Sequence, residues 1–231
     1  MNVKLFAKTE IQIVNWVVFN VSSQIPCFSF RNHKPLNAIK FATYFSLTKK
    51  INIALVGNPN SGKSSLFNVL TGLNQKVGNF PGVTVDKKTG TTTITPGVDA
   101  LLIDLPGTYS LYPKRADEWV AYKVLLNQDE TVKPDMVLLV ADASNLKRNL
   151  LFCSQIIDLK IPVVVALTMM DLANNKGTQI DIPGLERELG VPIVPINPRK
   201  NKGILPLKKA LGLAVEKIDQ LPPRDFIDTQ A

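Results

Sequence analysis

The sequence predicts an α/β fold, with a mainly parallel sheet covered by helices on both faces. The first observation is a series of continuous apolar runs, at Ile51–Val56, Met136–Ala141 and Pro162–Leu167, separated by segments with helical patterns. Strands that are buried on both faces give such runs, because neither face alternates with solvent. The second observation is a pair of strand-like runs, Lys87–Ile94 and Ala100–Asp104, joined by the turn sequence Thr-Pro-Gly-Val, which predicts a hairpin.

The remaining elements follow in chain order. Helices are expected at 62–71, 117–127, 145–159, 184–189 and 204–218, and a last strand at 192–196. Residues 74–86 contain two glycines and a proline, and we expect a mobile loop there. Ligands of such sheets bind beyond the carboxyl ends of the strands, so the loops that follow the strands should gather at one edge.

A phosphate-binding motif makes the fold prediction specific. Gly57-Asn-Pro-Asn-Ser-Gly-Lys-Ser64 fits the pattern G-x-x-x-x-G-K-[ST] and stands between a predicted strand and a predicted helix. Its backbone N–H groups would cradle phosphates, Lys63 would reach the β- and γ-phosphates, and the Ser64 hydroxyl would ligate Mg²⁺. We therefore predict the three-layer P-loop NTPase fold, with six strands of which one is antiparallel.

Composition narrows the function classes. The 231 residues carry a net charge of +8, but residues 1–50 hold +6 of it and residues 51–231 only +2. A near-neutral body gives no indication of a nucleic-acid-binding face. Cys27 and Cys153 stand far apart, which argues against a disulfide framework or a zinc site, and His33 is the only histidine. The longest uncharged stretch near the N-terminus, Ile11–Phe30, contains too many polar residues for a membrane span or a signal peptide.

Three further motifs follow the phosphate-binding loop. Asp104-Leu-Pro-Gly107 ends a strand, where an aspartate can hold the hydration shell of Mg²⁺ and a glycine N–H can contact a γ-phosphate. Thr84 could complete Mg²⁺ coordination. After another strand, Asp171 could accept hydrogen bonds from the N1–H and N2–H₂ groups of guanine, which adenine lacks. Asn197-Pro-Arg199 would contact the base edge through its backbone.

The order of these motifs resembles the five G motifs of translation-factor-like GTPases. Three segments narrow the resemblance to the G domain of the ferrous iron transport protein B family: the loop 57–64, Gly78-Asn-Phe-Pro-Gly-Val-Thr-Val85, and Asp104-Leu-Pro-Gly-Thr-Tyr-Ser-Leu111. Ala116-Asp-Glu118, with the helix after it, is also similar. The likeness covers about residues 51–216.

The resemblance implies a slow, K⁺-stimulated GTPase that regulates Fe²⁺ transport. Lys63, Asn60, Thr84 and Gly107 would be catalytic, Ser64, Thr84 and Asp104 would hold Mg²⁺, and Asn60 with the carbonyl groups of Gly78 and Phe80 would hold K⁺. Thr108 stands where Ras-like proteins have a water-orienting glutamine, which favours slow turnover. The expected nucleotide-binding residues are Gly57, Asn58, Asn60, Ser61, Gly62, Lys63, Ser64, Ser65, Gly82, Val83, Thr84, Asp104, Gly107, Thr168, Met169, Asp171, Asn197, Pro198 and Arg199.

Two departures from the family pattern fall at the base end of the expected site. Thr168 replaces the usual asparagine of N-x-x-D, and Asn197-Pro198 replace a small Ser-Ala pair. We therefore expect a preference for GTP with weakened base binding. Two alternatives remain, a soluble GTPase of ribosome or RNA maturation and a nucleotide-binding module that does not hydrolyse.

The resemblance also sets the expected domain organisation and partners. Residues 1–50 are expected to be a basic extension outside the fold, 51–216 the G domain, and 217–231 a linker or the start of a helical domain. Three interpretations of this extension stay open: a disordered segment, a membrane-surface segment, or residues translated from too early a start. Expected partners are GTP or GDP and the permease domain of an iron transporter at the inner face of the bacterial membrane, with no nucleic acid; self-association is left open.

Overall fold

The computed structural model describes residues 48–72, 75–80, 85–129 and 133–218. All of them except 48 and 49 belong to one compact unit, Lys50–Ala231. None of the helices within these residues is both long and apolar enough to cross a membrane.

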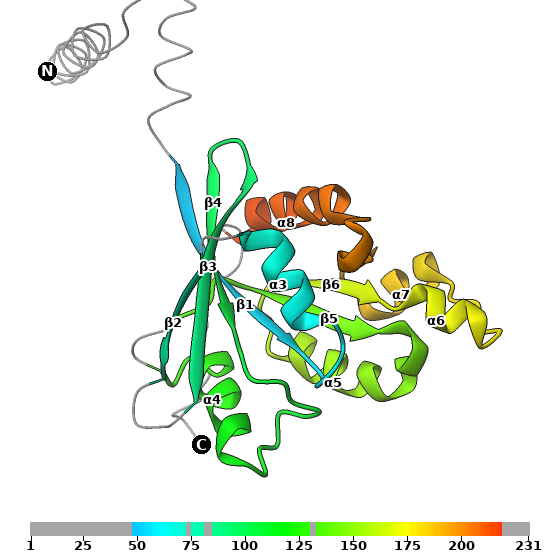
Figure 1. Cartoon of the computed structure of the whole chain (residues 1–231), viewed down its shortest axis with the longest axis horizontal. Coiled ribbons are helices and arrows are strands. Elements are labelled where there is room, and N and C mark those ends of the chain that lie inside the picture. Colours follow the sequence, from blue (N-terminus) through cyan, green and yellow to red (C-terminus); the bar gives the residue numbers. More distant parts are fainter. Residues whose placement is uncertain (1–47, 73–74, 81–84, 130–132, 219–231) are drawn as a thin grey trace, which may run out of the picture. The chain divides into compact units, whose positions relative to one another are not determined.

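One sheet organises the described residues, with strand order β2-β3-β4-β1-β5-β6-β7 (Figure 1). Neighbours β1, β5, β6 and β7 pair in parallel, whereas β3 is antiparallel to both β2 and β4. The strands are β1 (Lys49–Gly57), β2 (Gln75–Asn79), β3 (Asp86–Thr95), β4 (Val98–Asp104), β5 (Met136–Asp142), β6 (Val163–Thr168) and β7 (Ile193–Pro195).

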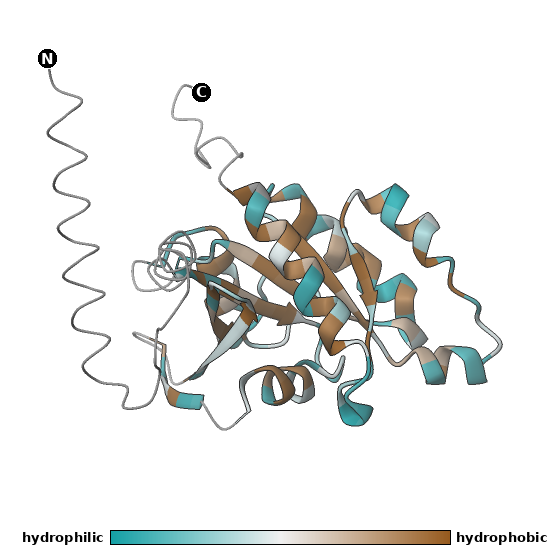
Figure 2. Cartoon of the chain, turned by 90° about the horizontal axis from the view of Figure 1, so that it is seen from above, coloured by the Kyte–Doolittle hydropathy of each residue, from teal (hydrophilic) through white to brown (hydrophobic). Residues whose placement is uncertain are grey.

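Helices cover both faces of the sheet. They are α3 (Lys63–Thr71), α4 (Ala116–Leu125), α5 (Leu146–Asp158), α6 (Met170–Asn175), α7 (Ile182–Leu189) and α8 (Ile204–Ile218), with short 3₁₀ turns η1 (Ala143–Asn145) and η2 (Pro198–Lys200). Helices α3 and α8 share one hydrophobic core with one face of the sheet, and α4, α5 and α7 share the other. Figure 2 shows the hydrophobic colours concentrated in the strands between these helices.

The two cores follow from the pleat of the strands. In β1, Ile53 and Leu55 point into the core beneath α3, while Ala54 and Val56 point into the core on the opposite face. All four are at most 1% exposed. Because both faces are buried, apolar and polar residues do not alternate in this part of the strand. The buried strand also determines where the loop after Gly57 begins at the edge of the sheet.

The predicted fold class is confirmed, with two differences in its elements. Within the described residues the sheet has seven strands rather than six, because Gln75–Asn79 forms β2 where we expected a mobile loop. All five residues of β2 are exposed, so its sequence carries no apolar pattern, and pairing with β3 alone defines it. Helix α6 was also not predicted; only Ala173 is buried in it.

Candidate nucleotide-binding site

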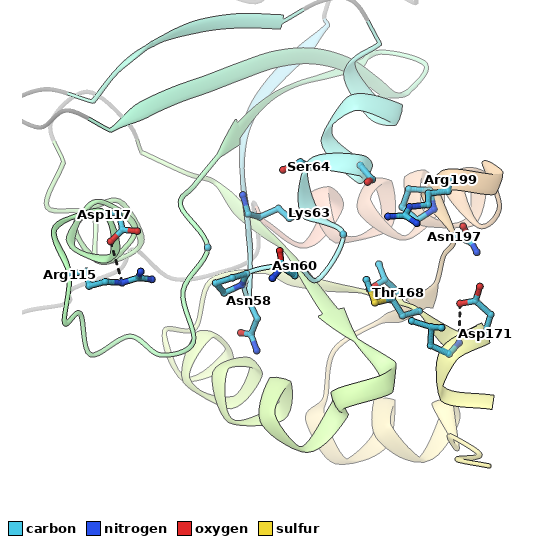
Figure 3. A pocket seen from close by; sticks show the side chains of 17 residues that line it. Asn58, Asn60, Lys63, Ser64, Arg115, Asp117, Thr168, Asp171, Asn197 and Arg199 are labelled. Carbon is cyan, nitrogen blue, oxygen red and sulfur yellow. Dashed lines mark hydrogen bonds and ion pairs between the residues drawn. The ribbon is translucent and has the colours of Figure 1, made fainter. Parts of the chain in front are cut away.

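A cavity of about 870 Å³ opens where β1 passes into α3, β6 into α6 and β7 into η2. Its volume is within the range of small-molecule sites. Figure 3 shows Asn60 and Lys63 at its middle, Asp171, Asn197 and Arg199 at one end, and Arg115 with Asp117 at the other. The lining residues are Asn58, Pro59, Asn60, Gly62, Lys63, Ser64, Ser65, Gly107, Arg115, Asp117, Thr168, Met169, Asp171, Leu172, Asn197, Pro198 and Arg199.

The loop between β1 and α3 forms the floor of the middle section. Two of its residues have left-handed backbone conformations, Asn60 with φ 65° and Gly62 with φ 91°. Gly57 leaves no room for a side chain, since a Cβ there would lie 2.5 Å from the carbonyl oxygen of Val140. The tight turn brings the first residues of α3 to the cavity, and N–H groups in the first turn of a helix lack helical partners. This part of the cavity can therefore bind an anion.

Lys63 forms an ion pair with Asp104, the last residue of β4. Both side chains are nearly buried, with 12% of Lys63 and 8% of Asp104 exposed. Lys63 lines the cavity, whereas Asp104 lies outside the lining. An anion that binds Lys63 must therefore compete with the Asp104 carboxylate or share the ammonium group with it.

The segment after β4 lies against the phosphate-binding loop. A Cβ on Gly107 would be 3.2 Å from backbone and ring atoms of Pro59, so a side chain here would have to push Pro59 away by a few tenths of an ångström. The N–H of Thr108 donates to the carbonyl oxygen of Gly57 over 3.2 Å. The Thr108 hydroxyl donates to Ser110 within its own loop, and the side chain is 2% exposed. Gly107 lines the cavity, whereas Thr108 is not among its lining residues.

Thr168 connects the segment that carries Asp171 to the loop between β1 and α3. Its hydroxyl oxygen lies 2.7 Å from the carbonyl oxygen of Ser61 and 3.1 Å from that of Ala141, and its one proton can be donated to either. The side chain is 2% exposed, and a Cβ on Gly62 would lie 3.6 Å from its methyl group. Thr168 thus holds these two segments together.

Removing this hydroxyl is expected to destabilise the domain. Thr168→Val keeps the shape but leaves two buried carbonyl groups without this donor, so the free energy of unfolding should fall by about 1–2 kcal/mol. Thr168→Ser keeps the donor and should lose less. Urea denaturation measures both variants. A loss in Thr168→Ser without a loss in Thr168→Val would show that the methyl contact with Gly62, and not the hydrogen bond, carries the effect.

Asp171 and the turn at 197–200 form the far end of the cavity. Met169, with φ 57°, turns the chain so that Asp171 falls in the first turn of α6. The Asp171 side chain is exposed, and its Oδ1 accepts the N–H of Leu172 over 3.1 Å. Asp171 and Asn197 both line this cavity, and Figure 3 shows them toward the same end of it. A carboxylate in this position can accept hydrogen bonds from a ligand that carries adjacent donors.

Four lining residues were not predicted from the sequence: Pro59, Arg115, Asp117 and Leu172. Arg115 precedes α4 and is 3.7 Å from Asp117 and 3.6 Å from Glu118. The N–H of Lys114 donates to Glu118 over 2.8 Å, which fixes the start of α4. Acidic residues in the first turn of α4 could have indicated the helix start, but no sequence signal places that start beside the cavity.

Some predicted site residues lie outside the lining. Gly57 and Ser61 are buried in the loop itself, and Asp104 pairs with Lys63. Gly78 lies on the exposed edge strand β2, and Phe80 is 2% exposed, with its N–H donated to Val85 over 3.0 Å. Of the predicted K⁺ ligands, Asn60 lines the cavity, whereas Gly78 and Phe80 are not among the lining residues. Gly82, Val83 and Thr84 lie outside the described residues.

Cys153 lies in α5 and is buried in the core. Burial disfavours the thiolate and raises the pKa of this thiol to about 12, although a backbone hydrogen bond partly offsets the rise. The thiol is therefore protonated at neutral pH and is no nucleophile.

Comparison with known proteins gives one family. The family model described as ferrous iron transport protein B matches residues 51–211. The Fe(2+) transporter FeoB of Leptospira biflexa is 48% identical over 164 residues, which cover 71% of this chain and 23% of the relative. The Fe(2+) transporter FeoB of Salmonella typhimurium is 45% identical over 167 residues, 71% of this chain and 21% of the relative. The chain thus spans less than a quarter of the length of these relatives.

Solved structures give the same result. The G domain of the T. maritima FeoB iron transporter is 40% identical with a TM-score of 0.65, and the match covers 72% of this chain and 99% of that one. A variant of S. thermophilus NFeoB bound to mGDP is 44% identical with a TM-score of 0.63, covering 71% of this chain and 60% of that one.

Proposed function

Because this chain belongs to the ferrous iron transport protein B family, we propose that residues 51–216 bind GTP, hydrolyse it slowly and so regulate Fe²⁺ transport. The observation that carries the proposal is that one cavity joins the phosphate-binding loop to the carboxylate of Asp171. The relatives named above as Fe(2+) transporters support the link to iron, and the mGDP-bound neighbour supports a guanine nucleotide.

In the proposed complex the phosphates bind in the middle of the cavity. The N–H groups at the start of α3 and the Lys63 ammonium would bind the β- and γ-phosphates. Ser64 lines the cavity, and Asp104 forms an ion pair with Lys63; hydroxyl and carboxylate oxygens are ligands that suit Mg²⁺. Mg²⁺, when bound, would neutralise charge on the phosphates. Lys63 would then exchange the Asp104 carboxylate for phosphate oxygens.

At the other end, Asp171 would select guanine. Its carboxylate would accept the N1–H and N2–H₂ groups, whereas the same edge of adenine presents no such pair of donors. The preference for GTP over ATP is therefore assigned to this one exposed side chain. The hydrogen bonds of Thr168 would hold the Asp171 segment in place relative to the phosphates.

Slow turnover is expected because this chain has no side chain at position 108 that could orient the attacking water. The Thr108 hydroxyl is bonded within its own loop. Charge that develops between the β- and γ-phosphates would be balanced by Lys63, Mg²⁺ and a K⁺ ion held by Asn60, which lines the cavity. The N–H of Gly107 would contact the γ-phosphate.

The test is the rate of phosphate release from GTP and ATP, measured in KCl and in NaCl on the full chain. We expect GTP hydrolysis to exceed ATP hydrolysis and to rise when K⁺ replaces Na⁺. GDP binding without hydrolysis in either salt would favour a nucleotide-binding module. Salt-sensitive binding of RNA by residues 51–231 would instead favour a role in RNA maturation.

Asn60→Ala should abolish the difference between the two salts, because it removes the side-chain oxygen proposed for K⁺. The rate in NaCl should stay within about twofold, since no other phosphate contact changes. Asn127→Ala is the matched control: Asn127 is also exposed and has φ 57°, but it lies outside the cavity lining. K⁺ stimulation that survives in Asn60→Ala would remove Asn60 from the proposed cation site.

The role in transport is proposed for the cytoplasmic side of the membrane. The curated relatives are more than four times as long as the matched segment, and their names describe Fe(2+) transporters. We therefore expect the nucleotide state of this domain to control a permease part that carries Fe²⁺ as its substrate. Phosphate release that responds to an attached permease would support this coupling.

A further inference from the structure

The turn at the base end of the cavity has few main-chain donors. The N–H of Asn197 donates to the carbonyl oxygen of Lys202 over 2.9 Å, and the N–H of Lys200 donates to the carbonyl oxygen of Asn197 over 3.1 Å. The side chain of Asn197 also accepts the Lys200 N–H, over 3.2 Å. Pro198 has no N–H at all. Within residues 197–200 of the described chain, only Arg199 keeps a main-chain N–H that the turn does not use.

Position 198 is nevertheless part of the cavity. Pro198 is buried and lines the same end as Asp171 and Asn197. Its ring therefore presents carbon atoms to a bound base where another residue would offer an N–H group. This feature of the chain bears directly on which atoms of a purine are recognised.

Guanine offers two kinds of group on this edge. N1–H and N2–H₂ are donors, which a carboxylate accepts, and O6 is an acceptor, which needs a donor from the protein. We propose that guanine is selected by Asp171 through its two donor groups. We propose also that the 6-oxygen has no partner in the turn, because Pro198 offers no N–H there and the unused N–H of Arg199 does not reach it. This proposal rests on the function proposed above and extends it to the specificity of the same site.

The consequence is a defined pattern of tolerance among purine nucleotides. A guanine nucleotide whose 6-oxygen is replaced by sulfur keeps both donors for Asp171 and loses only a good acceptor. An inosine nucleotide keeps the 6-oxygen and loses the 2-amino donor. The site should therefore tolerate the first change and reject the second.

The experiment is calorimetric titration of the full chain with GDP, 6-thio-GDP and IDP. We expect 6-thio-GDP to bind within about threefold of GDP, and IDP to bind about tenfold more weakly or worse, because a hydrogen bond to a charged group is lost. Pro198→Ala adds an N–H at the first position of η2, which no bond inside the turn requires. This variant should tighten GDP by about three- to tenfold and leave 6-thio-GDP within about twofold.

The control for removing a proline from this region is Pro195→Ala. Pro195 ends β7 and is exposed, and it does not line the cavity, so its loss should leave all three affinities within about twofold.

Each outcome separates the two proposals. A loss of tenfold or more for 6-thio-GDP in the unsubstituted chain would overturn this inference, because a donor must then read the 6-oxygen, and GDP binding would still support the proposed function. Equal tightening of GDP and 6-thio-GDP in Pro198→Ala would also overturn it. A chain that binds none of the guanine nucleotides would overturn the proposed function and the inference together.

Discussion

Lys63→Ala is expected to weaken GDP binding by about a hundredfold or more. The ammonium would make charge-assisted hydrogen bonds to the phosphates, and each such bond contributes about 1.5–3 kcal/mol. The same change leaves the Asp104 carboxylate, 8% exposed, without its cation. Loss of one partner of a buried pair typically costs about 3–5 kcal/mol, so the free energy of unfolding should fall by about 3 kcal/mol.

A double variant separates the two effects of this change. Lys63→Ala with Asp104→Asn removes the uncompensated charge, and it should recover most of the stability without recovering affinity. Calorimetry with GDP and urea denaturation measure the two quantities. Lys209→Ala, which removes an exposed lysine of α8, serves as the control and should change neither. Tight GDP binding by Lys63→Ala would exclude this loop as the phosphate site.

Asp171→Asn is expected to exchange guanine for xanthine. An amide offers one acceptor and one donor, which match the N1–H and the 2-oxygen of xanthine, whereas guanine would place its 2-amino group against the amide N–H₂. GDP affinity should fall by about a hundredfold, because the bond from N2–H₂ to a charged group is lost and the bond from N1–H becomes a neutral one, and XDP should become the better ligand. The Asp171 side chain is exposed, so the fold should be unaffected.

Titration with GDP, XDP and ADP measures this exchange. Asp158→Asn makes the same chemical change at an exposed position near the end of α5 and should leave the order of affinities unchanged. If Asp171→Asn still preferred GDP over XDP, the guanine contact would have to be assigned to another residue.

The sequence predicts those parts of the fold that bury apolar surface on a regular period. Runs such as Met136–Ala141 are buried on both faces and are recognisable without any partner. Gln75–Asn79 has no buried residue, so its strand exists only through pairing with β3, which is a tertiary property. Helix α6 was not predicted for a similar reason: its one buried residue is an alanine, so its sequence has no apolar stripe.

The candidate site also has residues that the sequence predicts and residues that it does not. The phosphate-binding loop and Asp171 were predicted, because their residue types and spacing indicate a binding function even without a structure. Arg115 and Asp117 were not, because only the packing of α4 brings them to the cavity. The Thr168 hydroxyl was expected to mark a weaker base contact; its bonds to Ser61 and Ala141 could be found only by knowing which carbonyl groups lie nearby.

The ion pair between Lys63 and Asp104 also bears on the nucleotide affinity of this domain. The Lys63 ammonium already has an anionic partner in the same chain. The Asp104 carboxylate therefore competes with any ligand for this ammonium. Capture of a nucleotide is then an exchange of anions rather than a simple addition. The free energy of the ion pair would then be subtracted from the affinity for any nucleotide that binds Lys63.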